Sequence, residues 1–389
     1  MDQIFLKKNE DKRILSGHLW IFSNEIAKFP ESASNGDMVE VYDFKSNALG
    51  IGFFNKNSLI TVRLISRNVS SDLRSLFYER IKTAYQLRKV FYPQRESFRL
   101  VFSESDFLPG LIIDKYNNTF VLQINSFGMH KEIHLITDIL KSEFKAENIF
   151  TKNDFYLSKL EGLPEEDNIF AGKIGTEIID DGFVKYRIDF NQSQKTGFYF
   201  DQSDNRFFIR NIVKDKSVVD VFCNSGGFGL HALSAGAKSV DFVDASVIEI
   251  ENVKKNILLN KMGGEVNYFI NDAFEFLLEQ ENANKKYDIV MLDPPAFAKS
   301  KKSLPAAEKG YEKLNRLALQ IVEDGGYLVT SSCSYHLKKE NFMNCINRAA
   351  IKAEKLVQLL NFNEASLDHP KLPAMEETSY LKFAVFKVF

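Results

Sequence analysis

Five short apolar runs in the second half of the chain constrain its fold more than any other feature. They lie at residues 217–222, 239–243, 266–270, 287–292 and 326–330. The apolar residues in these runs are continuous, whereas a strand with one face in water would alternate apolar and polar side chains. Segments long enough for a helix separate the runs, as expected for parallel strands joined by crossovers. We therefore predict an α/β domain over residues 185–389, with a doubly wound, mostly parallel sheet.

Residues 1–70 have a different pattern. Polar and apolar side chains alternate over residues 37–43 and 59–65, and Gly50 and Gly52 interrupt a third strand-like run. Short strands with frequent turns are typical of a small β-barrel, and we predict one in this segment.

Residues 71–184 combine helices and strands. The capping pair Ser71-Asp72 precedes apolar residues spaced by three or four positions, which predicts an amphipathic helix. Two strands of a hairpin are predicted around Asn117-Asn118, and another helix is predicted over residues 129–145. The chain is therefore expected to be a multidomain α/β protein, with a central α+β domain between the barrel and the parallel sheet.

The composition limits the class of protein. Lys and Arg number 50 and Asp and Glu number 52, which excludes a uniformly basic nucleic-acid clamp but allows a local basic patch. Three cysteines are too few for a disulfide framework or a metal cluster, and they indicate a reducing compartment. The amino terminus lacks an apolar signal core, and four glycines interrupt the longest uncharged stretch, residues 221–237. We expect a cytoplasmic protein with no membrane segment and no metal.

A loop that contains three glycines follows the first apolar run. It extends from Cys223 to Gly229, and an acid, Asp220, lies inside the run itself. Such a loop between a strand and a helix lets a ligand approach backbone amides closely. Residues 227–232 match the G-x-G-x-x-A form of the dinucleotide fingerprint, but Gly227 lies five residues beyond the run, farther than that fingerprint requires. The arrangement instead resembles the acid-then-glycine loop of class I S-adenosylmethionine (SAM) methyltransferases.

Acidic residues also end the second and third runs. Asp244 closes the second run, where a carboxylate can accept hydrogen bonds from both ribose hydroxyls of either NAD or SAM. Asp272 and Ala273 follow the third run, where a side chain can reach an adenine. The alternative role of Asp272 is to cap the helix that follows.

The fourth and fifth runs carry the residues that favour one chemistry. Asp293 ends the fourth run and is followed by Pro294-Pro295-Ala296-Phe297, and the fifth run leads into Ser331-Ser332-Cys333-Ser334. If these runs are neighbouring strands, Asp293 and Cys333 emerge side by side at one edge of the sheet. A thiolate that adds to carbon 6 of cytosine, while an acid holds ring nitrogen 3, makes carbon 5 nucleophilic enough to take a methyl group. The alternative role of Cys333 is that of a small buried apolar side chain.

Two runs of positive charge suit a nucleic-acid partner. The first basic run, from Arg80 to Arg99, contains six Lys or Arg and one Glu. The second basic run, from Lys299 to Arg316, contains six Lys or Arg and two Glu directly after the Asp-Pro-Pro loop. Each run could hold a phosphate backbone or could be the solvated face of an ordinary helix.

Together these motifs resemble those of bacterial large-subunit ribosomal RNA 5-methylcytosine methyltransferases. The resemblance rests on residues 16–22, 195–206, 220–228, 293–297 and 331–334 and covers nearly the whole chain. It implies a PUA domain, a small RNA-binding β-barrel, over residues 1–70 and a central α+β domain with a connecting hairpin over residues 71–184. A Rossmann-like class I SAM methyltransferase domain would occupy residues 185–389. The resemblance also implies a homodimer and a large-subunit ribosomal RNA substrate.

The same resemblance implies roles for single residues. Cys333 would be the nucleophile, and Asp293 would hold the target base. The residues that it places around SAM are Phe200, Gln202, Arg206, Asn224, Ser225, Gly226, Asp244, Asp272, Ala273 and Asp293.

The leading hypothesis is a SAM-dependent RNA methyltransferase that forms 5-methylcytosine, with 23S ribosomal RNA as the expected substrate. A methyltransferase acting on an exocyclic base nitrogen is an alternative, because the sequence from Asp293 to Phe297 also resembles amino-methylating loops. A non-catalytic RNA-binding ribosome-assembly factor and an NAD oxidoreductase are alternatives from other functional classes.

Overall fold

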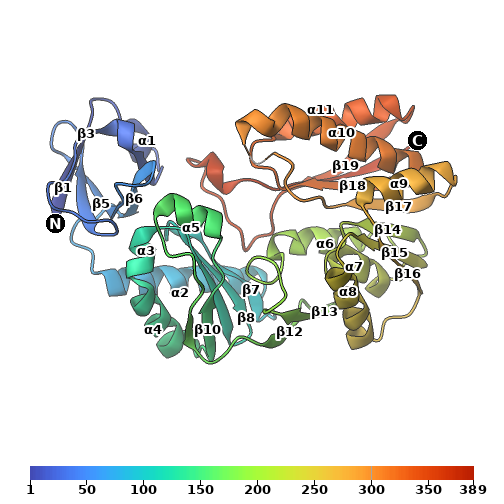
Figure 1. Ribbon diagram of the computed structural model, residues 1–389, viewed down its shortest axis with the longest axis horizontal. Coiled ribbons are helices and arrows are strands. Elements are labelled where there is room, and N and C mark those ends of the chain that lie inside the picture. Colours follow the sequence, from blue (N-terminus) through green and yellow to red (C-terminus); the bar gives the residue numbers. More distant parts are fainter. Residues whose placement is uncertain (299) are drawn as a thin grey trace. The chain divides into compact units, whose positions relative to one another are not determined.

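The computed structural model describes residues 1–298 and 300–389. The chain forms two compact units, each assembled from three segments. Unit 1 consists of Met1–Ile179, Ile188–Phe200 and Leu367–Thr378, and unit 2 consists of Asp180–Arg187, Asp201–Ser366 and Ser379–Phe389. Figure 1 follows the chain from its blue amino terminus to its red carboxyl terminus.

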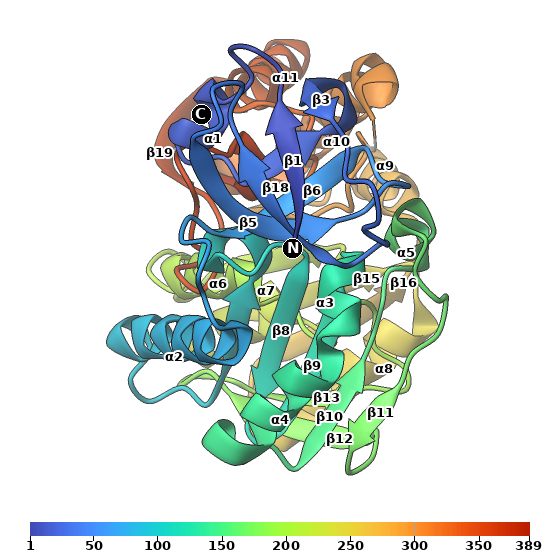
Figure 2. The same ribbon diagram turned by 90° about the vertical axis from the view of Figure 1, so that its left-hand side faces the viewer.

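Unit 1 begins with a six-stranded sheet in the order β2-β6-β5-β4-β1-β3, drawn in blue in Figure 2. Its strands are β1 (Asp2–Leu6), β2 (Trp20–Phe22), β3 (Ile26–Lys28), β4 (Met38–Tyr42), β5 (Ala48–Phe54) and β6 (Ile60–Ser66), and α1 (Lys12–Leu15) follows β1 in the chain. The two alternating runs predicted as strands are β4 and β6, so both predictions are confirmed. The β1–β4 pair is parallel, and the other neighbours in this sheet are antiparallel.

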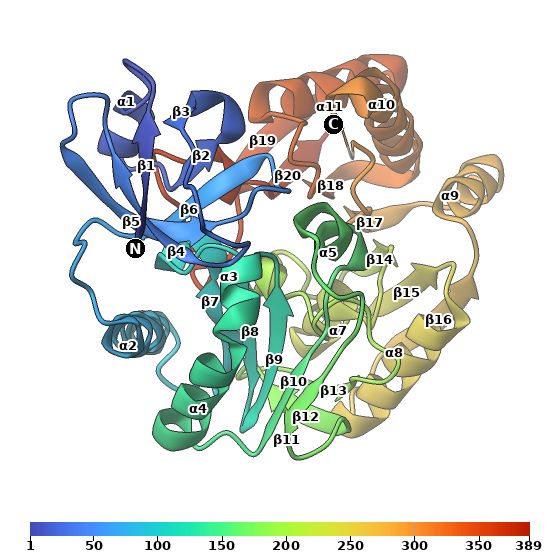
Figure 3. The same ribbon diagram turned by 60° about the vertical axis from the view of Figure 1, so that its left-hand side comes forward.

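A second sheet of unit 1 has the order β11-β10-β9-β8-β7. Its strands are β7 (Ser97–Phe102), β8 (Leu111–Tyr116), β9 (Thr119–Ile124), β10 (Asn148–Thr151) and β11 (Ile169–Ala171), and its helices are α2 (Leu73–Phe91), α3 (Phe127–Lys131), α4 (Ile133–Phe144) and α5 (Phe155–Glu161). The predicted amphipathic helix is α2, and the predicted hairpin is the β8–β9 pair. The single helix predicted over residues 129–145 is instead α3 and α4, separated at Glu132, where the backbone angles (φ −90°, ψ 10°) depart from the helical range. Figure 3 shows α2, α4 and the strands β7 to β10 of this part.

The two sheets of unit 1 share a hydrophobic core. Ile51 and Phe53 of β5 are buried in the same cluster as Phe98 of β7. At Gly128 in α3, an added Cβ would lie 2.0 Å from Cγ of Phe53, so only glycine allows the helix to approach β5 this closely. The domain boundary predicted at residue 70 therefore falls inside one compact unit.

Buried ion pairs fasten the carboxyl-terminal segment of unit 1 to its second sheet. Arg88 on α2 is fully buried, and its guanidinium donates to both carboxylate oxygens of Asp106 at 2.6 and 2.7 Å and to the carbonyl of Asp368 at 2.8 Å. The Asp368 carboxylate accepts from the backbone N–H of Arg99 at 2.9 Å, and the Arg99 guanidinium pairs with Asp114 at 2.8 Å. Arg88 and Arg99 of the first basic run are thus partners in internal ion pairs. Their charges therefore stabilise unit 1 and do not form a surface for a phosphate backbone.

A hairpin connects the two units. It consists of β12 (Thr176–Asp180) and β13 (Lys185–Asp189), which form a two-stranded sheet. The turn of this hairpin belongs to unit 2, and the outer ends of its strands belong to unit 1.

Unit 2 is built around a seven-stranded sheet in the order β16-β15-β14-β17-β18-β20-β19. Its strands are β14 (Ser217–Val221), β15 (Ser239–Asp244), β16 (Glu265–Ile270), β17 (Tyr287–Leu292), β18 (Val322–Ser332), β19 (Val357–Asn363) and β20 (Lys382–Val388). The five predicted strands are β14 to β18, and they pair in parallel, as predicted. The sequence analysis did not identify β19 and β20, which pair antiparallel beside β18.

Helices cover both faces of this sheet. They are α6 (Ser203–Ile209), α7 (Gly227–Ser234), α8 (Val247–Asn260), α9 (Ala273–Asn282), α10 (Leu304–Ile321) and α11 (Lys339–Lys352). Figure 1 shows α10 and α11 on one face and α7 and α8 on the other. The doubly wound arrangement predicted from the continuous apolar runs is confirmed, because strands buried on both faces need helices on both sides. Among the helices that the structure describes, none is long and apolar enough to cross a membrane.

Replacing Arg88 with Met is expected to lower the free energy of unfolding of unit 1 by about 3 kcal/mol, because it leaves the buried Asp106 carboxylate without its partner. Trp20 is the only tryptophan in the sequence and lies in unit 1, so its fluorescence during urea unfolding measures the change. Arg74→Met removes an exposed arginine from the same helix and should change the free energy by less than about 0.5 kcal/mol. Equal effects of the two substitutions would show that the buried pair does not stabilise unit 1.

Candidate functional site

The parallel strands of unit 2 bring the predicted residues to one edge of the sheet. Val221 is paired with Leu292 in β17 and with Val243 in β15, and Leu292 is paired with Thr330 in β18. The segments after these strands therefore leave the sheet at the same level. The residues that follow are the glycine-containing loop after β14, Asp244, Asp293 and Cys333.

The loop after β14 is shaped by backbone angles that favour glycine or asparagine. Phe222, Asn224 and Gly226 have φ values of 62°, 48° and 91°, and Gly226 precedes the first turn of α7. One carboxylate oxygen of Asp220 accepts from the backbone N–H of Gly229 at 2.8 Å, which ties the strand to the start of the helix. The carbonyl of Ser225 accepts from the side-chain amide of Asn256 at 3.1 Å.

The glycines that matched the dinucleotide fingerprint serve packing here. Gly227 and Gly229 both lie within α7. An added Cβ at Gly227 would lie 2.5 Å from Nε of Arg206, and one at Gly229 would lie 2.2 Å from Cε1 of Phe242. The space beside Gly227 therefore belongs to the Arg206 side chain, which argues against a pyrophosphate at this position.

Asp244 is the last residue of β15, and Asp272 directly precedes α9. The two carboxylate oxygens of Asp244 accept from the backbone N–H groups of Asn224 and Ser246, each at 2.9 Å. Asp272 is exposed and caps α9, with one carboxylate oxygen accepting from the first turn of the helix at 2.8 and 3.2 Å. The capping role considered for Asp272 is present, and its second carboxylate oxygen is not used by the cap.

Gln202 links the ends of β17 and β18. Its side-chain nitrogen donates to the Asp293 carboxylate at 2.9 Å and to the Ser331 hydroxyl at 3.2 Å. Its side-chain oxygen accepts from the amide of Asn205 at 2.7 Å, which fixes the orientation of the Gln202 amide. The predicted proximity of Asp293 to the end of the fifth strand is confirmed by this shared contact.

Buried carboxylates and the Arg206 guanidinium influence one another in the interior of this site. Burial raises the pKa of Asp220 to about 7, and the neighbouring Asp293 carboxylate contributes to that rise. Burial also raises the pKa of Asp293 to about 6, with Asp201 as a further cause and Arg206 acting in the opposite direction. Among the described residues, one buried oxygen of Asp220 and one of Asp201 have no hydrogen-bond partner. These two carboxylate oxygens are therefore available as acceptors.

Cys333 lies at the end of β18 beside the loop that follows β17. Its thiol is within 3.8 Å of the carbonyl oxygen of Pro294 and is neither fully buried nor fully exposed. The residues on either side of it are fixed, because the Tyr311 hydroxyl lies 2.9 Å from the Ser332 hydroxyl and 3.0 Å from the Ser334 hydroxyl. Cys333 is thus held at the sheet edge, beside the segment that follows Asp293, and the predicted juxtaposition is confirmed.

The other two cysteines have different surroundings. Cys223 is buried, and its pKa is raised well above the ordinary value by burial. Cys345 is buried in α11, and burial raises its pKa to about 11. A thiol becomes a nucleophile only as the thiolate, so neither environment suits catalysis.

Two predicted cofactor residues lie apart from the contacts described above. Phe200 belongs to unit 1, where its ring centroid is 5.2 Å from that of Tyr116. Ala273 is the first residue of α9 and is buried.

Sequence reasoning did not single out Asp201 or the strand residue Lys382, whose side-chain nitrogen donates to the carbonyl of Ser334 at 2.7 Å. Asp201 could have been found from the sequence, because it is adjacent to the predicted site residue Gln202. Lys382 could not, because only the antiparallel strand β20 brings it to the site.

The second basic run lies at the surface. Lys299 lies outside the described residues, but Lys301, Lys302, Lys309 and Lys313 are exposed. Arg316 pairs with Glu281 at 3.2 Å. Unlike the first basic run, this segment presents its charges to solvent next to the Asp-Pro-Pro loop.

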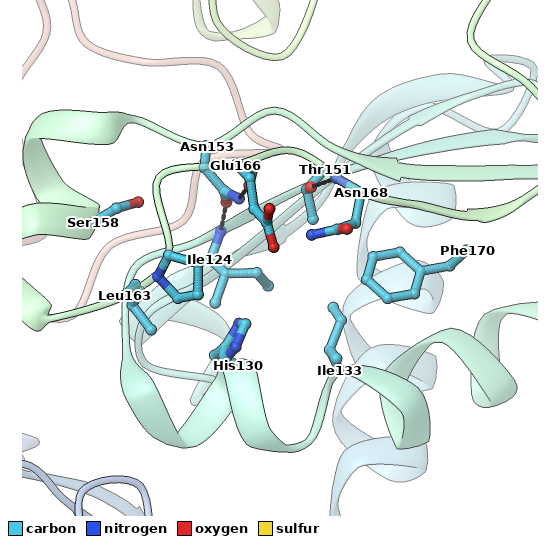
Figure 4. Close-up of a pocket in the computed structure, with 11 residues that line it drawn as sticks. Ile124, His130, Ile133, Thr151, Asn153, Ser158, Leu163, Glu166, Asn168 and Phe170 are labelled. Atoms are coloured by element: carbon cyan, nitrogen blue, oxygen red, sulfur yellow. Dashed lines mark hydrogen bonds between the residues drawn. The ribbon is translucent and has the colours of Figure 1, made fainter.

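A cavity in unit 1 is a different kind of feature. Residues of β9, β10, α3, α4 and the segment around α5 surround it, and they include His130, Asn153 and Glu166 (Figure 4). It encloses about 20 Å³, which suits a single water molecule. It is too small to bind a nucleotide or a cofactor.

Two family models match the chain. A PUA-like domain model matches residues 4–67, and a model described as conserved hypothetical protein 95 matches residues 199–332. Among curated proteins, the chain is 36% identical to the ribosomal RNA large subunit methyltransferase I of Pseudoalteromonas atlantica, with 99% of each chain covered. It is also 36% identical to the protein of the same name from Aliivibrio fischeri, with 97% of each covered.

The fold is similar to that of solved methyltransferase structures. A protein described as a methyltransferase and solved in complex with SAH superposes with a TM-score of 0.85 and 20% identity, covering 100% of both chains. A SAM-dependent methyltransferase from Streptococcus mutans superposes with a TM-score of 0.84, also with 20% identity and full coverage.

Asp220→Asn is expected to flatten the pH dependence of the stability of unit 2. The pKa of Asp220 is about 7 in the folded protein against 3.8 in an unfolded chain, so between these values the folded state binds more protons than the unfolded state. The contribution of this carboxyl group to stability is therefore full below about pH 4 and is lost progressively as the pH rises to about 7. Asparagine keeps an oxygen for Gly229 but cannot ionise, so from pH 5 to pH 8 the variant should gain about 3 kcal/mol relative to the parent.

Urea unfolding at each pH, followed by circular dichroism, measures this difference. The matched control is Asp215→Asn, which replaces an exposed carboxylate in the same unit and should leave the pH dependence unchanged. Parallel stability curves for Asp220→Asn and the parent would show that Asp220 is ionised throughout this range.

Proposed function

Since this chain belongs to the ribosomal RNA large subunit methyltransferase I family, we propose that it forms 5-methylcytosine in large-subunit ribosomal RNA through a covalent adduct of Cys333. The methyl donor is S-adenosylmethionine, and the RNA-methyltransferase class follows from the family. The choice of cytosine carbon 5 rests on one observation, the thiol of Cys333 held beside the segment that follows Asp293.

The residues of the site fit a cationic cofactor. S-adenosylmethionine supplies an electrophilic methyl group on a sulfonium centre, and it also carries an ammonium group. The buried oxygens of Asp220 and Asp201 that have no hydrogen-bond partner among the described residues offer acceptors for such positive charge. Burial is the main cause of the raised pKa values of both Asp220 and Asp293, and the Arg206 guanidinium acts against the rise at both carboxylates. A bound positive charge would favour the ionised form of both groups.

We assign the remaining contacts of the cofactor by position in the sheet. Asn224, Ser225 and Gly226 would surround its amino-acid part, Asp244 would accept from the ribose hydroxyls, and the unused oxygen of Asp272 would reach the adenine with Ala273 as its apolar neighbour. Gln202 and Arg206 would hold the carboxylates of the site in place. Phe200 stays a prediction, because it belongs to the other unit.

Asp293 and Cys333 would divide the chemistry on the pyrimidine ring. The Cys333 thiolate adds to carbon 6, and the electron pair displaced from the 5,6 double bond moves toward ring nitrogen 3. The Asp293 carboxyl group, with a pKa raised by burial to about 6, can share its proton with that nitrogen and so stabilise the developing charge. Carbon 5 would then take the methyl group of the sulfonium, which would leave S-adenosylhomocysteine. A base would remove the proton from carbon 5, and elimination of the Cys333 thiolate would restore the double bond.

The second basic run would hold the RNA beside this site. Its exposed lysines at positions 301, 302, 309 and 313 follow the Asp-Pro-Pro loop directly, and phosphate neutralisation by such residues is the main source of affinity for nucleic acid. We also retain two predictions: a homodimer, which the family resemblance implies, and a location in the cytoplasm, which the low cysteine content indicates.

Cys333→Ala should abolish methylation of large-subunit ribosomal RNA, with a loss of at least about a thousandfold, because no other thiol of the site can add to carbon 6. The measurement is digestion of the reacted RNA to nucleosides and identification of the methylated one by mass spectrometry. Cys345→Ala is the matched control, since it removes a buried thiol in α11 and should keep activity within about threefold. Full activity of Cys333→Ala, or a product methylated on an exocyclic nitrogen, would refute the covalent route.

Replacing Lys301, Lys302 and Lys309 together with Ala should weaken RNA binding and make it less sensitive to salt. Three lost phosphate contacts predict a decrease of about 2 in the slope of log Kd against log salt concentration. Fluorescence anisotropy with a labelled ribosomal RNA fragment measures both quantities. Lys214→Ala with Lys255→Ala removes two exposed charges elsewhere in unit 2, and an equal change in slope for this pair would argue against a dedicated surface.

A further inference from the structure

We propose that Lys382 is a positioning residue that acts through Cys333, holding an ammonium group beside the thiol so that the thiolate form is favoured. This inference rests on the covalent route proposed above. It concerns the state of the nucleophile before RNA binds, so it can be tested without substrate.

Strand pairing places Lys382 next to the nucleophile. Lys382 is the first residue of β20 and is paired with Ser332 in the antiparallel ladder, one residue before Cys333. This pairing sets Lys382 level with the last residue of β18. Figure 3 shows β20 beside β18 in this part of unit 2. A residue far away in the sequence is thus brought next to the loop that carries the thiol.

Hydrogen bonds fix the ammonium group at this point. The side-chain nitrogen of Lys382 donates to the carbonyl oxygen of Ser334 at 2.7 Å and to that of Tyr380 at 2.6 Å. The Lys382 residue is 6% exposed, so its charge is removed from bulk water. Because Ser334 directly follows Cys333, the ammonium is bound to the same short segment that presents the thiol.

Packing alone does not explain why a lysine is buried at this position. Two neutral carbonyl acceptors do not balance the charge of an ammonium group, and burying a charge without a charged partner is costly. Burial lowers the pKa of Lys382 to about 8, and Cys333 is the largest influence that opposes this shift. Stabilisation between two titrating groups is mutual, so an anionic Cys333 and a protonated Lys382 favour each other.

Other charged and titratable groups face the ammonium from the surrounding segments. Lys338, which precedes α11, acts against the protonated form, and Glu364, after β19, favours it. Tyr311 on α10 contacts the Ser332 and Ser334 hydroxyls of the cysteine segment, and burial raises its pKa. Lys382 is therefore protonated and charged at neutral pH, while Tyr311 stays neutral and serves as a hydrogen-bond partner.

The test is the pH dependence of alkylation at Cys333 in the full-length protein, with iodoacetamide as the probe and mass spectrometry of the Cys333 peptide as the readout. Only the thiolate reacts, so the rate at each pH reports the thiolate fraction. Lys382→Met should slow alkylation at pH 7 by about tenfold and move the midpoint of the pH profile upward, since an opposite charge nearby stabilises the ionised form. Lys382→Arg keeps the charge and should restore most of the rate.

Lys387→Met is the matched control, because it removes a lysine from the same strand whose side chain reaches the carbonyl of Gly325 instead. Near-UV circular dichroism establishes that each variant is folded, and Lys382→Gln replaces Lys382→Met if the latter does not fold. An unchanged pH profile in the folded Met or Gln variant would overturn the proposal. Failure of the proposed function would appear differently, as a product other than 5-methylcytosine with the alkylation profile still dependent on Lys382.

Discussion

The parallel pairing of β17 with β14 on one side and β18 on the other is the constraint on which the site depends. It sets the ends of three strands at one level, so that the glycine-containing loop, Asp293 and Cys333 leave the sheet together. Strands buried on both faces cannot shift by one residue without turning apolar side chains toward the wrong helices. The position of the thiol relative to the acid is therefore as well defined as the core of unit 2.

The electrostatics of unit 2 favour a cationic ligand. Asp220 and Asp293 are buried with raised pKa values, and a single guanidinium, that of Arg206, acts against the rise at both positions. In the absence of a ligand, this arrangement opposes ionisation and so costs stability at neutral pH. A protein tolerates such a cost where binding or catalysis needs it. The same argument applies to the buried Lys382 beside the cysteine segment. Its ammonium group would stabilise the thiolate form of Cys333.

Unit 1 shows the opposite use of buried charge. Arg88 and Arg99 are paired with Asp106 and Asp114, and the Asp368 backbone and side chain complete the network. Each of the two arginines is paired with a carboxylate, and the network ties together segments that are distant in the sequence. The contrast between matched charge in unit 1 and unmatched charge in unit 2 separates a structural network from a candidate site more clearly than the number of basic residues does.

The parallel strands of unit 2, the helix α2 and the positions of Asp293 and Cys333 after strand ends could be predicted from the sequence, because continuous or periodic apolar patterns and strand-end residues are local properties. Tertiary structure alone decided which arginines are internal, since ion pairing depends on residues far along the chain. It also decided the position of Lys382, because an antiparallel strand near the carboxyl terminus brings this residue to the cysteine segment. Long-range pairing of this kind leaves no periodic signal in the sequence, so neither the network around Arg88 nor the setting of Cys333 could be predicted from local pattern.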